Sequence, residues 1–377
     1  MRKDFEYEFL GKKIVVETGE LAKQANGAVL VRYEDTVILS TAVMSNNVST
    51  ADFFPLTILY QEKLYSVGKI PGGFIKREGR PTDAATLTAR VIDRPIRPMF
   101  DENFRNEVQV VNTVLSVDND YTPEMTALFG TSLALGISSI PFDGPVAGVK
   151  VGKIDGVLKI NPTVEEMERS TIDLTVAGTK NAINMVESGS KEVSEEEMLE
   201  ALMFGHEYIK ELCAIQEDII NEVGKEKITV ELASLNPEIV KEVESDIKND
   251  MVMAIQIKDK LEKYAKIDEL KERAITNYTE KHSESETLES ELKQVKKIAD
   301  NIEGTEVRRL ITDEKVRPDG RGMTEIRELS TRKDLLPRTH GSALFTRGQT
   351  QALAITTLGA LGEHQILDGI MPEDEKR

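Results

Sequence analysis

The chain has 377 residues and a formal net charge of -18, with 40 % hydrophobic and 30 % charged residues. This length predicts two or three domains. The negative net charge argues against a protein that coats nucleic acid nonspecifically, so any contact with RNA must come from a local basic patch. With no apolar run of about 18 residues and no apolar core near the start, we expect neither a membrane span nor a secretory signal. One cysteine, Cys213, excludes an internal disulfide and suits a reducing cytoplasm. The four histidines show no ligand spacing, which argues against a zinc site.

The first part of the chain is dominated by β-branched and alternating runs that predict strands. Two of these runs are separated only by Glu34-Asp35, which predicts a hairpin. A buried helix rich in small residues is expected over 123–139. Strands are expected over 13–17, 28–33, 36–43, 53–60, 106–117, 146–157 and 173–177.

The segment 69–98 is basic in an otherwise acidic chain, with seven basic residues against three acidic ones. It begins with a glycine turn, Gly72-Gly73, which allows tight backbone conformations. Phe74 follows, and then Lys76, Arg77 and Arg80. An aromatic ring can stack on a base of single-stranded RNA for ~1–3 kcal/mol, while cations contact its phosphates. A plain solvated loop is the alternative interpretation.

A helix is expected to follow this loop, with Thr82 as its N-cap. Ala84, Leu87 and Val91 are predicted to form its apolar face, and Pro95 and Pro98 to end it. Arg97 is a further candidate RNA contact, although an arginine beside proline is often held by a local ion pair.

From Ser194 onward the sequence pattern changes from strand-like runs to helical periodicity. Ser194 with Glu197 three residues later is a capping-box pattern, and it predicts a long helix that stops near Gly224. The segment 237–302 is highly charged with helical spacing of its apolar residues, and a break is expected at 282–285. We expect this helical segment to act as a spacer with solvated charges, and an RNA role for it is the weaker alternative.

An internal repeat then appears. The run 26–39 aligns without a gap to 340–353. The pairs Gly27 and Gly341, Leu30 and Leu344, Thr36 and Thr350, and Leu39 and Leu353 are identical. The strand–turn–strand pattern repeats as well, so the sequence predicts a second copy of the first core that starts after the helical segment.

These stretches resemble one family closely. The order GKIPG, an aromatic and basic loop, EGRP and IDRPIRP within residues 68–98 resembles the first core of bacterial polynucleotide phosphorylases. RPDGR at 317–321 and PRTHGSALFTRGQTQAL at 337–353 resemble the start of that family's second core. The loop departs from the family, which often has two aromatics and two arginines where this chain has Ile75 and Lys76.

The resemblance implies an α+β fold of the RNase PH type, also described as ribosomal protein S5 domain 2-like, with mixed sheets and helices. It implies a first core over 1–235, an all-helical domain over 236–310 and the beginning of a second core over 311–377. Because so short a second core cannot bury a normal interior, we expect the chain to be a truncated piece or a processed fragment. The KH module and the oligonucleotide-binding barrel of the family are not in this sequence.

The resemblance further implies phosphorolysis of single-stranded RNA from its 3′ end, with inorganic phosphate as co-substrate and nucleoside diphosphates as products. The implied cofactor is Mg²⁺, bound outside this chain. No catalytic residue is assigned here, because the family's catalytic residues belong to the part of the second core that this sequence lacks. In the first core, Thr171 stands where the second core of the family has a metal-binding aspartate, and Asp173 remains alone. We therefore expect a degenerate first core.

The predicted RNA contacts are Phe74, Lys76, Arg77, Arg80, Arg97 and Arg321. The implied partners are single-stranded RNA, two further copies in a cytoplasmic homotrimer, and proteins of an RNA-degradation complex. The alternative is a noncatalytic RNA-binding or scaffolding module of the same fold. A hydrolytic nuclease that uses metal alone is disfavoured, because no cluster of acidic residues lies on neighbouring predicted strands.

Overall fold

The computed structural model describes residues 2–118, 120–230, 232, 234–371 and 375–376. The chain forms two compact units, one made of 1–233 with 364–377 and the other of 234–363. The predicted boundaries of the three domains stay a prediction. No helix in the described ranges is both long enough and apolar enough to cross a membrane.

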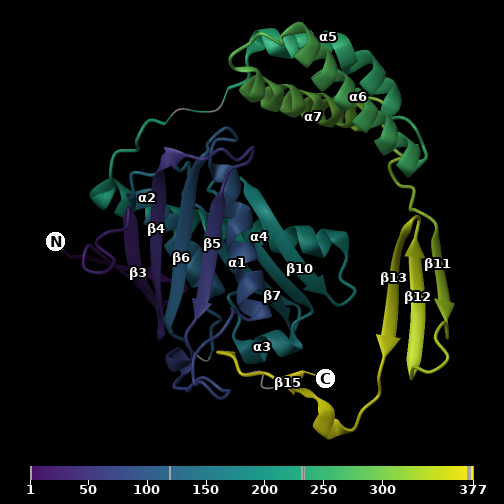
Figure 1. The fold of residues 1–377 in the computed structure, drawn as a ribbon. Coiled ribbons are helices and arrows are strands. Elements are labelled where there is room, and N and C mark those ends of the chain that lie inside the picture. Colours follow the sequence, from purple (N-terminus) through teal and green to yellow (C-terminus); the bar gives the residue numbers. More distant parts are fainter. Residues whose placement is uncertain (1, 119, 231, 233, 372–374, 377) are drawn as a thin grey trace. The chain divides into compact units, whose positions relative to one another are not determined.

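The first unit contains a six-stranded sheet with the order β1-β2-β3-β4-β6-β5. All neighbours in it are antiparallel except β5 and β6, which run parallel. Short turns connect β1 to β2 and β3 to β4, whereas the parallel pair needs a crossover. The strands are β1 (Lys3–Phe9), β2 (Lys12–Thr18), β3 (Gly27–Tyr33), β4 (Thr36–Val48), β5 (Leu56–Glu62) and β6 (Asn106–Ser116) (Figure 1).

Helix α1 (Asp83–Ile96) lies in the crossover between β5 and β6. Its N-cap is Thr82, as predicted, because the Thr82 side chain accepts a hydrogen bond of 2.9 Å from the backbone N–H of Ala85. The predicted apolar face is wrong, because Leu87 is 57 % exposed. The helix instead buries the face formed by Ala85, Thr88, Ile92, Pro95 and Ile96.

Pro95 does not end α1 but lies in its last turn. The helix ends one residue later, at Ile96, and the backbone N–H of its C-cap Arg97 bonds to the carbonyl of Asp93. The short 3-10 helix η2 (Arg97–Met99) follows directly, and another, η1 (Leu64–Val67), precedes the basic loop.

A second sheet of the first unit is antiparallel with the order β10-β9-β7-β8. Its strands are β7 (Ala147–Ile154), β8 (Val157–Ile160), β9 (Ile172–Gly178) and β10 (Ile183–Ser190). Helix α2 (Glu124–Ile137) is almost wholly buried, as its small and apolar residues predicted, and it contributes to a core shared with residues of both sheets. The short helix α3 (Val164–Arg169) precedes β9.

Helix α4 (Glu195–Val223) ends the continuous part of this unit. The predicted capping box is confirmed, since Ser194 accepts from the N–H of Glu197 and the Glu197 carboxylate accepts from the N–H of Ser194. The two short strands β14 (Gln365–Ile366) and β15 (Glu375–Lys376) also belong to this unit.

The second unit begins with three helices that pack around a core of their own. They are α5 (Pro237–Ala254), α6 (Lys260–Lys281) and α7 (Leu288–Thr312) (Figure 1). The predicted break at 282–285 falls between α6 and α7. A three-stranded sheet follows, made of β11 (Leu329–Lys333), β12 (Gly341–Arg347) and β13 (Thr350–Thr356), and then the 3-10 helix η3 (Leu361–Glu363).

The two copies of the internal sequence repeat form β-hairpins with the same strand register. Leu30 lies directly opposite Leu39 in the β3–β4 hairpin, and the equivalent Leu344 lies directly opposite Leu353 in the β12–β13 hairpin. In each case the preceding strand pairs with the first strand of the hairpin: β2 pairs with β3, and β11 pairs with β12. The predicted strand–turn–strand repeat and the α+β class are both confirmed.

Candidate nucleic-acid interface

The loop that carries the predicted RNA contacts connects η1 to α1 and is tied down at several points. The Glu78 carboxylate accepts a hydrogen bond of 3.1 Å from the backbone N–H of Leu64, and its second oxygen lies 3.3 Å from Lys63 Nζ. At the other end of the loop, Thr82 Oγ1 donates to Glu62 at 2.9 Å. The loop is therefore a positioned element, anchored by its one acidic residue.

The start of the loop is held by a segment distant in sequence. The backbone N–H of Gly72 donates to the carboxylate of Asp368 at 3.1 Å, and Lys69 Nζ donates to the carbonyl of Gly369 at 3.0 Å. Ile370 is buried in the core of the first unit, which fixes this segment in place. Gly73 has a φ of 71°, a left-handed value that glycine adopts without strain.

The tip of the loop presents apolar groups to solvent. Phe74 is 100 % exposed, and Ile70 and Ile75 are also largely exposed. Exposing a ring of this size gives up the free energy that its burial would contribute, ~1.5–3 kcal/mol. A ring held out in this way is available to stack on a base.

The cations of the loop stand beside that ring. Lys76, Arg77 and Arg80 are all exposed, and within the described part of the chain none of them forms an ion pair. Lys76 has a φ of 51°, a left-handed backbone conformation that is uncommon for a residue with a side chain. The cations and the Phe74 ring therefore belong to one short, anchored turn.

A cleft of about 470 Å³ lies between this loop and the end of β5. Arg77 and Arg80 line it together with Glu62 and Asp368. Burial raises the pKa of the Glu62 carboxyl above its ordinary value, while the hydrogen bond from Thr82 opposes that shift. The cleft therefore has mixed charge: Glu62 lies at the sheet, whereas Asp368 and Glu78 are engaged by the Gly72 and Leu64 N–H groups. Arg77 and Arg80 are the groups in it that could contact a phosphate.

Arg97 lies apart from the loop, in a structural network. Its guanidinium donates to the carboxylate of Asp93 through Nε at 2.8 Å and Nη2 at 2.7 Å. It also donates to the carbonyls of Phe54 and Leu56, each at 3.1 Å. These hydrogen bonds indicate that Arg97 joins α1 to the start of β5. The RNA contact predicted at Arg97 stays a prediction.

Arg321 belongs to the second unit, in the turn that follows α7. Its side chain is 17 % exposed and its Nε donates to Asp319 at 2.8 Å. Burial opposes ionisation of Asp319, but the hydrogen bonds and the charge of Arg321 outweigh it and lower the pKa of the carboxyl. The RNA contact predicted at Arg321 stays a prediction.

The two residues considered for a degenerate metal site lie in and beside β9. Thr171 Oγ1 donates to the carbonyl of Lys153 at 3.3 Å, and Asp173 is exposed in the middle of its sheet, opposite Gly152 and Gly189. In the ranges that the structure describes, no three His, Cys, Asp or Glu side chains gather where they could hold a metal ion.

Sequence reasoning missed the residues that anchor the loop. From the sequence, Glu78 is only one acidic charge in a basic segment, because its anchoring contacts depend on the position of η1. Asp368 is 296 residues away from Gly72 along the chain, and no local pattern signals that contact.

Comparison with protein families gives three matches along the chain. Residues 11–141 match the 3′ exoribonuclease family, domain 1, and residues 144–208 match domain 2 of that family. Residues 238–322 match the polyribonucleotide nucleotidyltransferase RNA binding domain. The expected RNase PH-like core is thereby confirmed.

Curated relatives are similar over almost the whole chain. A polyribonucleotide nucleotidyltransferase of Enterococcus faecalis is 60 % identical over 367 residues, which cover 97 % of this chain and 52 % of the relative. That of Anoxybacillus flavithermus is 60 % identical, covering 99 % and 53 %. That of Listeria welshimeri is 58 % identical, covering 99 % and 51 %. The chain thus spans about half the length of the curated relatives it matches.

Proposed function

Because this chain belongs to the polyribonucleotide nucleotidyltransferase family, we propose that it forms part of an enzyme that degrades RNA by phosphorolysis. In this reaction an oxygen of inorganic phosphate attacks the phosphorus of the 3′-terminal linkage. The bond from that phosphorus to the 3′ oxygen of the preceding nucleotide breaks, and this oxygen takes up a proton. The products are a nucleoside diphosphate and an RNA shortened by one nucleotide.

Within this enzyme, the chain guides single-stranded RNA. The observation that carries this role is the anchored loop, which exposes the whole ring of Phe74 next to Lys76, Arg77 and Arg80. Stacking on the ring tolerates any base, and the cations follow the phosphates, so the loop suits a strand that must pass through it. Arg97 stabilises the helix behind the loop.

Catalysis belongs to the rest of the second core. In the first core, Thr171 and the solitary Asp173 do not provide the paired carboxylates that a Mg²⁺ site requires. We infer that the whole enzyme binds phosphate and Mg²⁺ outside this chain. Assembly into a cytoplasmic ring of three would present the loop three times to one strand, and weak single contacts would then add. Proteins of an RNA-degradation complex are further partners.

A noncatalytic RNA-binding or scaffolding module is the second candidate. The exposed loop and the matched RNA binding domain favour it, because neither depends on a catalytic site. The two candidates differ in whether a longer protein that contains this chain releases nucleoside diphosphates.

The test incubates the chain, and separately a full-length protein of the same family, with a single-stranded oligoribonucleotide, phosphate and Mg²⁺. We expect the chain to retain RNA without releasing nucleoside diphosphate, and the full-length protein to release it. Release by the chain alone would overturn the assignment of the chemistry to the rest of the second core. Failure of the chain to bind RNA would overturn its guiding role.

A further inference from the structure

The second unit contains a basic cleft that the guiding loop does not explain. Its volume is about 490 Å³, which is within the range of small-ligand sites. Six basic residues and two acidic residues line it, in a chain whose net charge is -18. The basic ones are Lys258, Lys260, Lys263, Arg321, Arg327 and Arg347.

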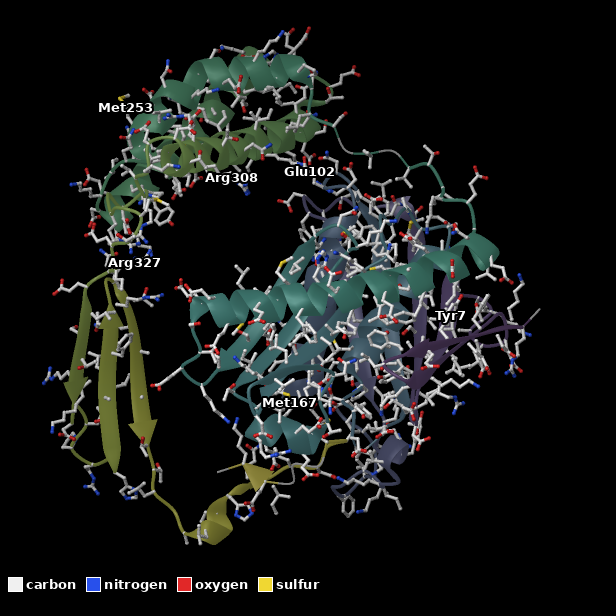
Figure 2. All side chains as sticks on the ribbon, turned by 180° about the vertical axis from the view of Figure 1, so that it is seen from behind. Tyr7, Glu102, Met167, Met253, Arg308 and Arg327 are labelled. Atoms are coloured by element: carbon white, nitrogen blue, oxygen red, sulfur yellow. The ribbon has the colours of Figure 1, made fainter. Side chains whose placement is uncertain are left out.

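Three elements bring these residues together. Lys258 lies in the connection between α5 and α6, and Lys260 is the first residue of α6. Arg347 ends β12 at the turn to β13. Figure 2 labels Arg327, which comes just before β11, where the helices meet the three-stranded sheet. A cleft with cations on separate elements can hold a charged strand along its length.

Local contacts fix the geometry of the cleft. Gly320 has a φ of 82°, and a Cβ at that position would come within 3.1 Å of Lys258 Cε, so the lysine stem lies against this turn. Lys263 Nζ donates to the carbonyl of Pro318 at 3.3 Å. Arg327 packs its stem over Gly348 in the same manner. These contacts position the stems of Lys258 and Arg327, and they hold the ammonium group of Lys263 at the Pro318 carbonyl.

Only part of the positive charge is neutralised within the protein. Asp319 pairs with Arg321 at 2.8 Å and lies 3.6 Å from Arg327. In the described residues, Lys258, Lys260 and Arg347 form no ion pair. The N-terminus of α6 is already capped, because the Asp259 carboxylate accepts from the backbone N–H groups of Leu261 and Glu262, so the cations and not the helix end carry the positive charge of the cleft. Three unpaired cations that repel one another in an acidic protein indicate a polyanionic ligand.

Tyr264 distinguishes between kinds of polyanion. It lines the cleft one turn into α6, and it is 48 % exposed. Bare phosphate or polyphosphate makes no use of a ring, whereas a nucleic-acid base stacks on one. The match of residues 238–322 to an RNA binding domain points the same way. These observations support an RNA role for the helical segment, the weaker of the two alternatives that its sequence offers.

We propose that this cleft binds single-stranded RNA, with Lys258, Lys260 and Arg347 on phosphates and Tyr264 stacked on a base. This inference relies on the proposed function for the identity of the polyanion, but its residues are separate from those of the guiding loop.

The test measures binding of a fluorescent oligoadenylate of about ten nucleotides to the full 377-residue chain. The cleft variant carries Lys258→Gln, Lys260→Gln and Arg347→Gln. The control carries Lys241→Gln, Lys293→Gln and Lys296→Gln, which remove equal charge from α5 and α7 outside the cleft. The cleft variant and the control are each made in a second background as well, in which the loop cations Lys76, Arg77 and Arg80 are replaced by glutamine. Far-UV circular dichroism and thermal melting confirm that each variant is folded.

We expect the cleft variant to reduce the slope of log K against log salt by about 2, since each phosphate contact on a single strand contributes about 0.7. The control should leave the slope unchanged. Tyr264→Ala should weaken binding at least about 5-fold, and Tyr264→Phe should not.

A cleft variant that binds RNA like the control in both backgrounds would overturn the inference, whatever the effect of the loop substitutions. A loop variant without effect, beside an active cleft, would instead count against the guiding loop alone. Equal loss of tripolyphosphate and RNA binding, with no effect of Tyr264→Ala, would reassign the cleft to bare phosphate and overturn the RNA assignment.

Discussion

Asp93 and Arg97 form an ion pair of two hydrogen bonds, 2.8 Å and 2.7 Å long, across one turn at the end of α1. Because the same guanidinium also bonds to the carbonyls of Phe54 and Leu56, it joins the helix to the strand that precedes the guiding loop. A cation used in this way has few donors left for a phosphate.

The first prediction concerns this pair. Arg97→Lys keeps the charge but loses the planar fork, so it should lower the free energy of unfolding by about 1–2 kcal/mol. RNA affinity of the folded variant should change by less than about 2-fold, since the loop remains. Urea unfolding and fluorescence anisotropy measure the two quantities. A large loss of RNA affinity without a loss of stability would make Arg97 a direct RNA contact.

Phe74 is expected to act on RNA and not on stability. Its ring is fully exposed, so Phe74→Ala should leave the melting temperature unchanged. The same substitution should weaken RNA binding by ~1–3 kcal/mol, the contribution of one stacked base. Phe74→Tyr should retain binding, and Ile75→Ala is the matched control at an exposed apolar neighbour. Equal effects of Phe74→Ala and Ile75→Ala would show that general hydrophobicity, and not stacking, holds the RNA.

Glu78 is expected to position the loop without touching RNA. Glu78→Ala removes the acceptor for the Leu64 N–H and the partner of Lys63, so the loop loses its main anchor. Hydrogen exchange over residues 69–82 should become faster, and RNA affinity should fall about 3-fold because the loop must be ordered on binding. The slope of affinity against salt should stay unchanged. Unchanged hydrogen exchange would contradict the anchoring role.

Cys213 provides a probe of the core. Burial, and next the nearby Glu217 carboxylate, raise the pKa of the Cys213 thiol to about 12. At pH 8 its thiolate fraction is then about 10⁻⁴, and the thiol is shielded from reagents as well. Labelling by a thiol reagent should be slower than in urea-unfolded protein by about 10³ or more. Labelling of the native chain at the unfolded rate would contradict this burial.

Local signals predicted much of the fold. The Ser194–Glu197 capping box lies within four consecutive residues, and the structure confirms it because both of its bonds are local. The hairpin repeat was also visible, since a register set by a short turn follows directly from the alternation of residues.

The features that the sequence did not predict depend on tertiary contacts. On α1, Leu87 and Ala85 are only two positions apart, and the neighbouring strand β5 decides which face of the helix is covered. Nothing near Gly72 in the sequence indicates its hydrogen bond to Asp368. The cleft beside Tyr264 was missed because its cations come from three separate segments, each unremarkable alone.

The most direct test of the guiding role neutralises the three loop cations by Lys76→Gln, Arg77→Gln and Arg80→Gln. The matched control removes three other exposed charges of the first unit by Lys23→Gln, Arg32→Gln and Lys191→Gln. Binding of a single-stranded oligoribonucleotide is measured over a range of salt concentrations. The account predicts that the loop variant loses affinity and that its salt slope falls by about 2, while the control retains both. A loop variant whose slope equals that of the control would contradict the claim that this loop holds RNA.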